Sequence, residues 1–245
     1  MKSSLAPIDE ATLLKVARNF LDSPNPQQQR FGRDLSRLCG LTSRQGPWAD
    51  RCHLLGLKGT EEGSVCLLVN LRVAGLVWDG NQPQLHTRGF VVALYVPAAY
   101  PHVKPSVRLL EPIAYSPHVL HPCSPLDEAS VPAELFGFLE QIRRQEMGWC
   151  CYIRSSIWTP AAEFDLALCL YLVSGIITGA RVWGERASLN RSALNWFQRE
   201  KARLPLGNPL PFPHEQMLSG SDWALRHEEE EEAIEWAQAE PGGVA

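Results

Sequence analysis

The chain has 245 residues, of which 45% are hydrophobic and 20% charged, and it carries a net charge of −4 at neutral pH. A chain of this length and composition can bury one sizeable hydrophobic core. The composition is that of a globular protein, and the negative net charge argues against a protein that binds nucleic acid.

Cysteine usage and the N-terminus indicate the compartment. The seven cysteines are odd in number and scattered along the chain. The N-terminal sequence MKSSLAPIDE lacks the basic and then apolar layout of a secretory signal. Both features favour free thiols, and we expect a cytoplasmic protein.

Two amphipathic helices are predicted at the start of the chain. Asp9 is a candidate N-cap for the first helix. The second helix is indicated by Phe31, Leu35 and Leu38, which recur on one helical face. Gly40 is predicted to end this helix.

A strand-rich stretch follows the helices. Residues 64–75 and 89–96 are rich in β-branched and aromatic residues, and turn-forming residues at 79–84 separate them. Residues 106–112 are predicted as a third strand. Three strands with short connections indicate an antiparallel meander with one face covered by helices, and therefore an α+β fold.

Three further helices are predicted in the second half of the chain. The first is amphipathic and covers 132–147, and a shorter one covers 192–201. Between them, the most apolar run, 166–179, has fourteen residues, fewer than the roughly 20 that span a bilayer. This run therefore predicts a buried core helix, with Thr159 as N-cap and Pro160 as first residue.

The end of the chain is proline-rich and then acidic. From Ser221 onward it carries eight acidic residues and one basic residue, a net charge of −7, so the first 220 residues carry +3. A solvated tail is one interpretation of this run. Electrostatic docking on a basic partner surface, weakened by salt, is the other.

Four short motifs occur in order in the middle of the chain. They are VP at 96–97, YPHVKPSV at 100–107, YSPHV at 115–119, and a cysteine, Cys150, eight residues before WTP at 158–160. Each motif alone is common. Their order, on a strand, a second strand, a turn and the approach to a helix, is much more specific.

In these motifs the chain resembles the ubiquitin-conjugating enzyme family. The resemblance implies that family's fold, an antiparallel β-meander flanked by N-terminal helices, with a central core helix after the active-site loop. It also implies an activity. Such an enzyme accepts a ubiquitin-like modifier from an ATP-dependent activating enzyme, holds it as a cysteine thioester, and passes it to a lysine of a protein target. No cofactor, metal ion, nucleic acid or membrane is implied.

The resemblance also divides the chain. It makes residues 1–24 an extra N-terminal helix and residues 25–203 the conjugating-like domain. That domain carries a helical insertion at 126–147, which we expect to form a wall or lid near the thiol that limits which lysines approach. Residues 204–245 are then a proline-rich linker and an acidic tail.

Two adjacent cysteines compete for the role of nucleophile. Spacing to Trp158 selects Cys150, whereas the family's spacing from the preceding glycine, Gly148, selects Cys151. We predict Cys150 as the nucleophile and Cys151 as a buried packing residue, with Cys151 as the alternative nucleophile. A thiol suits acyl transfer, and with a pKa of about 8.5 a few per cent is thiolate near neutrality.

The chain departs from the family pattern at the third motif. The family's Tyr-His-Pro-Asn type sequence is here Tyr115-Ser116-Pro117-His118, so histidine replaces the asparagine that stabilises the oxyanion or shapes its loop. An imidazole N–H can donate the same hydrogen bond, a contribution of about 2.7–4 kcal/mol, or accept a proton from the incoming lysine. With the sequence CCY, this exchange makes the chain most similar to bacterial relatives in anti-phage conjugation operons.

Three other functions fit parts of the sequence. A catalytically inactive domain of this fold could bind a ubiquitin-like protein or another partner. His118, His121, Cys123 and one of the adjacent cysteines could form a zinc site, although their spacing is not a recognised ligand pattern. A hydrolase using Cys150 and His118 is disfavoured, because hydrolases generally place the cysteine at a helix N-terminus and the predicted helix begins only at Pro160.

Overall fold

The computed structural model describes residues 7–60, 63–110, 112–121, 147–153, 155–180, 189–200 and 207–213. The helices are α1 (Glu10–Leu21), α2 (Pro26–Thr42), α4 (Leu166–Thr178) and α5 (Arg191–Glu200). The strands are β1 (Cys52–Gly59), β2 (Val65–Leu71), β3 (Gly75–Trp78), β4 (Pro83–His86), β5 (Phe90–Val96) and β6 (Ser106–Leu109). The predicted α+β class is confirmed. The predicted insertion at 126–147, apart from Met147, and the acidic tail lie outside the described residues.

The main sheet has four antiparallel strands in the order β1-β2-β5-β6. Strands β2, β5 and β6 correspond to the predicted meander. The sequence analysis misses β1, because a register shift between Leu54 and Gly56 interrupts the alternation of apolar and polar residues that identifies a half-buried strand.

A separate hairpin, β3–β4, lies between β2 and β5 in the chain. The predicted strand at 64–75 therefore ends at Leu71, and the predicted turn at 79–84 overlaps the start of β4. Asp79 shapes the turn, since its Oδ1 accepts the N–H groups of Asn81 and Gln82, each at 2.8 Å. The hairpin approaches α4 closely at Gly75, where a Cβ would lie 2.6 Å from the carbonyl oxygen of Ile177.

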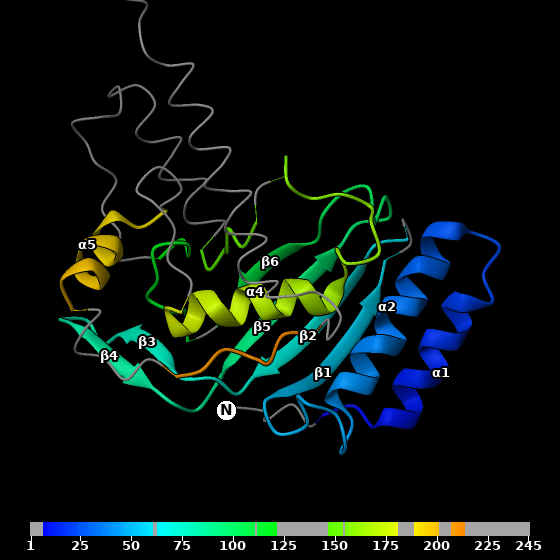
Figure 1. Cartoon of the computed structure of the whole chain (residues 1–245), viewed down its shortest axis with the longest axis horizontal. Coiled ribbons are helices and arrows are strands. Elements are labelled where there is room, and N and C mark those ends of the chain that lie inside the picture. Colours follow the sequence, from blue (N-terminus) through cyan, green and yellow to red (C-terminus); the bar gives the residue numbers. More distant parts are fainter. Residues whose placement is uncertain are drawn as a thin grey trace, which may run out of the picture.

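The predicted core helix is confirmed as α4, which lies across one face of the sheet (Figure 1). Nearly every residue of α4 is buried. The helix begins at Leu166, and its N-cap is Asp165, whose Oδ1 accepts the N–H of Leu168 at 2.8 Å. The predicted start at Thr159 and Pro160 is therefore wrong, because the residues between Pro160 and Asp165 form a loop that hydrogen bonds hold against α2.

The two predicted N-terminal helices are confirmed, and α1 lies on the outer side of α2 at the β1 end of the sheet (Figure 1). Asp9 caps α1 as expected, accepting the N–H of Thr12 at 2.9 Å. The rings of Phe20 and Phe31 pack the helices together, with centroids 4.8 Å apart. The second helix continues past Gly40 to Thr42, since a glycine weakens a helix by only about 1 kcal/mol and need not end it.

Residues 207–213, which we call the C-terminal strap, run beside α4 and appear in orange in Figure 1. Leu210 is buried in the main core, and its N–H donates to Ser174 Oγ at 2.9 Å. Trp48 Nε1 donates to the carbonyl of Pro211 at 2.8 Å. The sequence predicts a linker here, but the described part of it is packed against the domain.

No helix among the described residues is both long enough and apolar enough to cross a membrane.

Candidate functional site

The main sheet continues beyond β6 through two short segments. Residues 148–151 pair with β6, since Leu109 N–H donates to Gly148 at 2.7 Å and Cys150 N–H donates to Val107 at 2.9 Å. Residues 118–120 pair with the other edge of 148–151. The sheet therefore places the YSPHV motif directly beside the two adjacent cysteines.

Pairing between these segments fixes which side chains face each other. Val119 and Cys150 are antiparallel partners, and both are buried on the core face. His118 lies in the turn just before Val119, and Cys151 is the residue after Cys150. The N–H of Cys151 donates to the carbonyl of His118 at 2.9 Å, so the backbones of these two residues are adjacent.

The expectation that Cys150 is reachable from solvent is wrong. Its side chain is 2% exposed and belongs to the main hydrophobic core. Burial, with a smaller effect from Cys151, raises the pKa of the Cys150 thiol far above its ordinary value, and Lys104 opposes the rise only in part. Cys151 is partly exposed. The burial of the two cysteines is therefore the reverse of the predicted one, which favours the alternative, Cys151, as the candidate nucleophile.

Gly148 makes the geometry of this segment possible. Its φ is +81°, in the region that only glycine adopts readily. A Cβ at this position would lie 2.1 Å from the carbonyl oxygen of Leu109, which is the oxygen of a residue in the neighbouring strand. The turn at Gly148 thus lets the chain enter the sheet edge with Cys150 directed inward and Cys151 outward.

His118 lies where the sequence analysis places it, next to a cysteine, but its side chain is 0% exposed. In this conformation the His118 side chain cannot contact an incoming lysine. The hydroxyl of the nearby Ser116 donates to the carbonyl of Ile176 in α4 at 3.2 Å. The YSPHV turn is thus hydrogen-bonded to α4, and the carbonyl of His118 accepts a hydrogen bond from the segment 148–151, which contains both cysteines.

The second and fourth sequence motifs also touch each other. Trp158 Nε1 donates to the carbonyl of Pro101 at 2.7 Å. The hydroxyl of Tyr152, the residue after Cys151, donates to the carbonyl of Pro105 at 2.7 Å. Lys104 donates to the carbonyl of Ile153. These bonds attach the chain on the C-terminal side of the thiol to the proline-rich loop that follows β5.

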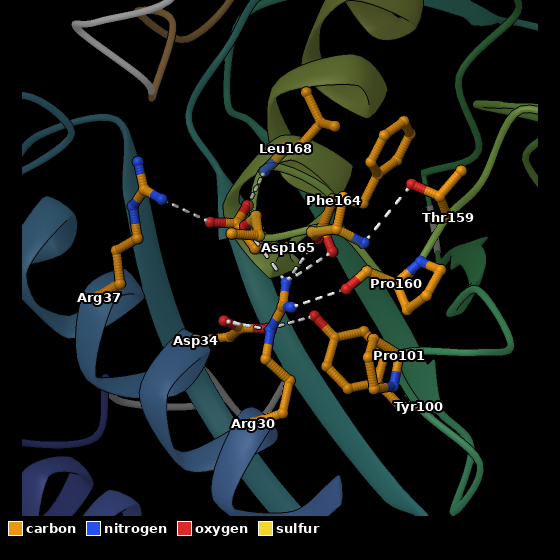
Figure 2. A network of polar contacts seen from close by, with 12 residues as sticks. Arg30, Asp34, Arg37, Tyr100, Pro101, Thr159, Pro160, Phe164, Asp165 and Leu168 are labelled. Carbon is orange, nitrogen blue, oxygen red and sulfur yellow. Dashed lines mark hydrogen bonds and ion pairs between the residues drawn. The ribbon is translucent and has the colours of Figure 1, made fainter.

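A polar network around Arg30 holds the loop between Trp158 and α4 (Figure 2). The guanidinium pairs with Asp34 at 2.8 Å and donates to four backbone carbonyls of that loop. They belong to Pro160, Ala161, Ala162 and Phe164, at 3.1, 3.1, 3.2 and 3.1 Å. The Tyr100 hydroxyl also donates to Asp34. Burial raises the pKa of the Asp34 carboxyl, and the hydrogen bonds from Tyr100 and Arg30 oppose the rise.

A second arginine of α2 contacts the same region. Arg37 pairs with the carboxylate of Asp165 at 3.0 Å, and Asp165 caps α4. The sequence analysis identifies neither Arg30 nor Arg37, because their partners in the loop before α4 lie more than 120 residues away and only the pair of Arg30 with Asp34 is local. The arrangement makes α2 the support of the loop that leads from the thiol to the core helix.

The two remaining alternatives from the sequence have little geometric support. In the part of the chain that the structure describes, no group of three or more His, Cys, Asp or Glu side chains is placed to hold a metal ion. One residue of the suggested zinc set, Cys123, lies outside that part. For a hydrolase, the helix after the cysteines starts at Leu166, further away than expected.

Comparisons with known proteins found no match to this chain among family models, curated proteins or solved structures.

Proposed function

We propose that this chain is a ubiquitin-conjugating-type transferase that carries a ubiquitin-like modifier as a thioester on Cys151. The modifier then passes to a lysine amine of a protein target, in bacterial anti-phage defence. One observation carries the proposal. Cys151 is a partly exposed residue whose backbone N–H donates to the carbonyl of His118, and hydrogen bonds attach the chain that follows it to the Tyr-Pro motif.

The chemistry consists of two acyl transfers. In the first, the Cys151 thiolate attacks the thioester carbonyl that joins the modifier to its activating enzyme. A new C–S bond forms, the old one breaks, and the enzyme's thiolate leaves. In the second, a lysine amine attacks the carbonyl on Cys151, the C–N bond forms, and the Cys151 thiolate leaves while the amine proton passes to solvent. The activating enzyme consumes the ATP, so this chain needs no cofactor of its own.

The fold is consistent with this proposal and supports it in outline. A four-stranded antiparallel sheet, an N-terminal helix α2 and a core helix α4 after the thiol segment are the elements that the resemblance implies. The additional helix α1 covers the outer side of α2 (Figure 1). In this proposal the activating enzyme docks on the surface that these two helices present.

A gel assay tests the proposal directly. Purified protein is mixed with a matched activating enzyme, the modifier and ATP, and a thiol-sensitive adduct is sought on a non-reducing gel. We expect the adduct in the wild type and in Cys150→Ala, and none in Cys151→Ala. We also expect Cys151→Ser to form an oxyester that survives thiol treatment. Loss in Cys150→Ala alone would return the nucleophile to Cys150, and a wild type without adduct contradicts the transferase.

A binding module without activity is the second candidate. It is favoured by the burial of the His118 side chain, which leaves the thiol without a solvent-facing base from the motif. Titration calorimetry with the modifier distinguishes the two functions. Binding of the modifier by wild type and Cys151→Ala alike, with no adduct in either, supports the binding module.

A further inference from the structure

The motif turn at 115–118 is held by elements from three parts of the chain. The backbone carbonyl of Leu76 in β3 accepts a hydrogen bond from the N–H of Tyr115 at 2.7 Å. A carbonyl of α4 accepts the hydroxyl of Ser116 at 3.2 Å. The third support is the start of α5. Because the carbonyl of His118 binds the N–H of Cys151, whatever fixes this turn also fixes the thiol segment.

Asn190, the residue just before α5, provides the third support. Its backbone N–H donates to the carbonyl of Pro117 at 3.0 Å, beside the N–H of Leu189 at 2.8 Å. Its side-chain Oδ1 accepts the N–H of Ala193 at 3.0 Å, which is the bond of a helix N-cap. The side chain is 0% exposed, so Asn190 lies entirely within the protein.

The nitrogen of the same side-chain amide has no such bond. Among the described residues, Asn190 Nδ2 has no hydrogen-bond partner. A buried donor without a partner costs about 1–3 kcal/mol. Serine and aspartate cap helices as well as asparagine does, and neither buries a spare N–H₂ group. Capping alone therefore does not explain an asparagine here, and the amide donor needs a role of its own.

We propose that Asn190 is a positioning residue of the thiol site, and that its amide donates to the 115–118 turn while Cys151 is being acylated. The asparagine that the family's motif would place at position 118 is absent, and Asn190, the residue just before α5, contacts the same turn through its backbone N–H. Since Asn190 is buried, it acts through the turn and does not touch the acyl group. The inference rests on the proposed function for its biological meaning, but its test needs no modifier.

Two reagents separate acyl transfer from general reactivity of the thiol. In acetylation by p-nitrophenyl acetate, the Cys151 thiolate attacks the ester carbonyl, a tetrahedral oxyanion forms, and p-nitrophenolate leaves. In alkylation by iodoacetamide, the thiolate displaces iodide and no oxyanion forms. Mass spectrometry of the peptide that contains Cys151 gives the rate of each reaction in the full chain, with Cys151→Ala as the background.

Asn190→Ser and Asn190→Asp keep a capping oxygen and remove the amide donor. We expect both variants to fold, to be alkylated at the wild-type rate, and to be acetylated at least about tenfold more slowly. That loss is smaller than the 10²–10³-fold typical of a donor that contacts the oxyanion itself. Asn195→Ser, the same change at an exposed position of α5, is the matched control and should leave both rates unchanged.

Three results would overturn the inference. One is acetylation of a folded Asn190 variant at the wild-type rate. Another is an equal fall in acetylation and alkylation, which would make Asn190 a structural residue only. The third is a wild-type Cys151 that is not acetylated at all. If acetylation behaves as expected while the modifier forms no adduct on a gel, the inference about Asn190 stands and the conjugating function fails.

Discussion

Cys150 and Cys151 are neighbours in the chain but lie in opposite environments. Cys150 is buried in the hydrophobic core, whereas Cys151 is partly exposed. Burial raises the pKa of Cys150, so its thiol stays neutral near pH 7 and becomes thiolate only as the pH rises through that elevated value. The thiolate is the reactive form, so the two residues should differ in reactivity although their sequence context is shared.

We therefore predict that iodoacetamide modifies Cys151 at least about tenfold faster than Cys150 in the folded protein at pH 7–8, since one pKa unit changes the thiolate fraction about tenfold. Fragment ions of the peptide that contains both residues give the two rates separately. In denaturant, where the difference in burial is gone, the rates should converge. Faster modification of Cys150 in the folded state would contradict the assignment of the two thiols.

The sequence alone does not show which of the two cysteines is buried, and the reason is physical. The spacing to Trp158 crosses an irregular loop, where one residue can be gained or lost without moving the ends. The spacing from Gly148 runs along paired, extended chain, where each residue changes the face that a side chain occupies. The second spacing is the more reliable guide to orientation.

The sequence around Asn190 gives no sign of the role proposed for it, because its contact with Pro117 depends on tertiary structure.

At the scale of elements, α2 is the support of the loop that leads to α4. We predict that Arg30→Lys lowers the free energy of unfolding by about 2–3 kcal/mol, because an ammonium group cannot reach Asp34 and the four loop carbonyls together. Urea denaturation followed by circular dichroism measures the change. Arg33→Lys, at an exposed position of the same helix, is the control and should change it by less than about 0.5 kcal/mol. Equal effects of the two variants would show that the network adds nothing to stability.

The C-terminal strap is the second element whose contribution can be measured. Leu210 is buried in the main core, so Leu210→Ala should lower the free energy of unfolding by about 2–5 kcal/mol. Leu85→Ala makes the same change at a side chain that is 47% exposed and should cost less than about 0.5 kcal/mol. Thermal or urea unfolding compares the two. A Leu210→Ala variant as stable as Leu85→Ala would mean that the strap is not docked in solution.

The predicted elements agree with the structure where the hydrophobic pattern is regular. The apolar run predicts helix α4, and the β-branched residues predict β2 and β5. The sequence predicts a linker at the strap because proline lacks an N–H and breaks regular structure. Its carbonyls remain available as acceptors, and donors distant in sequence use them. Arg37, Trp48 and Arg51 donate to carbonyls of the strap.

At the scale of the whole molecule, the ends of the described chain belong to one core. Leu13 of α1 and Leu210 of the strap are members of the same hydrophobic cluster, together with residues of the sheet and α4. Ile8 N–H donates to the carbonyl of Leu54 in β1 at 2.8 Å. The boundaries at 24 and 204 that the sequence suggests therefore mark changes of composition, while packing continues across them.

We accordingly predict a single cooperative unfolding transition for the full chain. Trp48 is buried next to the strap and Trp158 is buried beside the thiol loop, so tryptophan fluorescence reports on two distant regions. Far-ultraviolet circular dichroism reports on the helices and the sheet. If one core holds α1, the sheet, α4 and the strap together, the two signals should give the same midpoint in urea. Trp48→Phe and Trp158→Phe, examined separately, assign the fluorescence change to each region. Distinct midpoints for the two regions would show that the strap or α1 unfolds independently, and would restore the division of the chain into separate units.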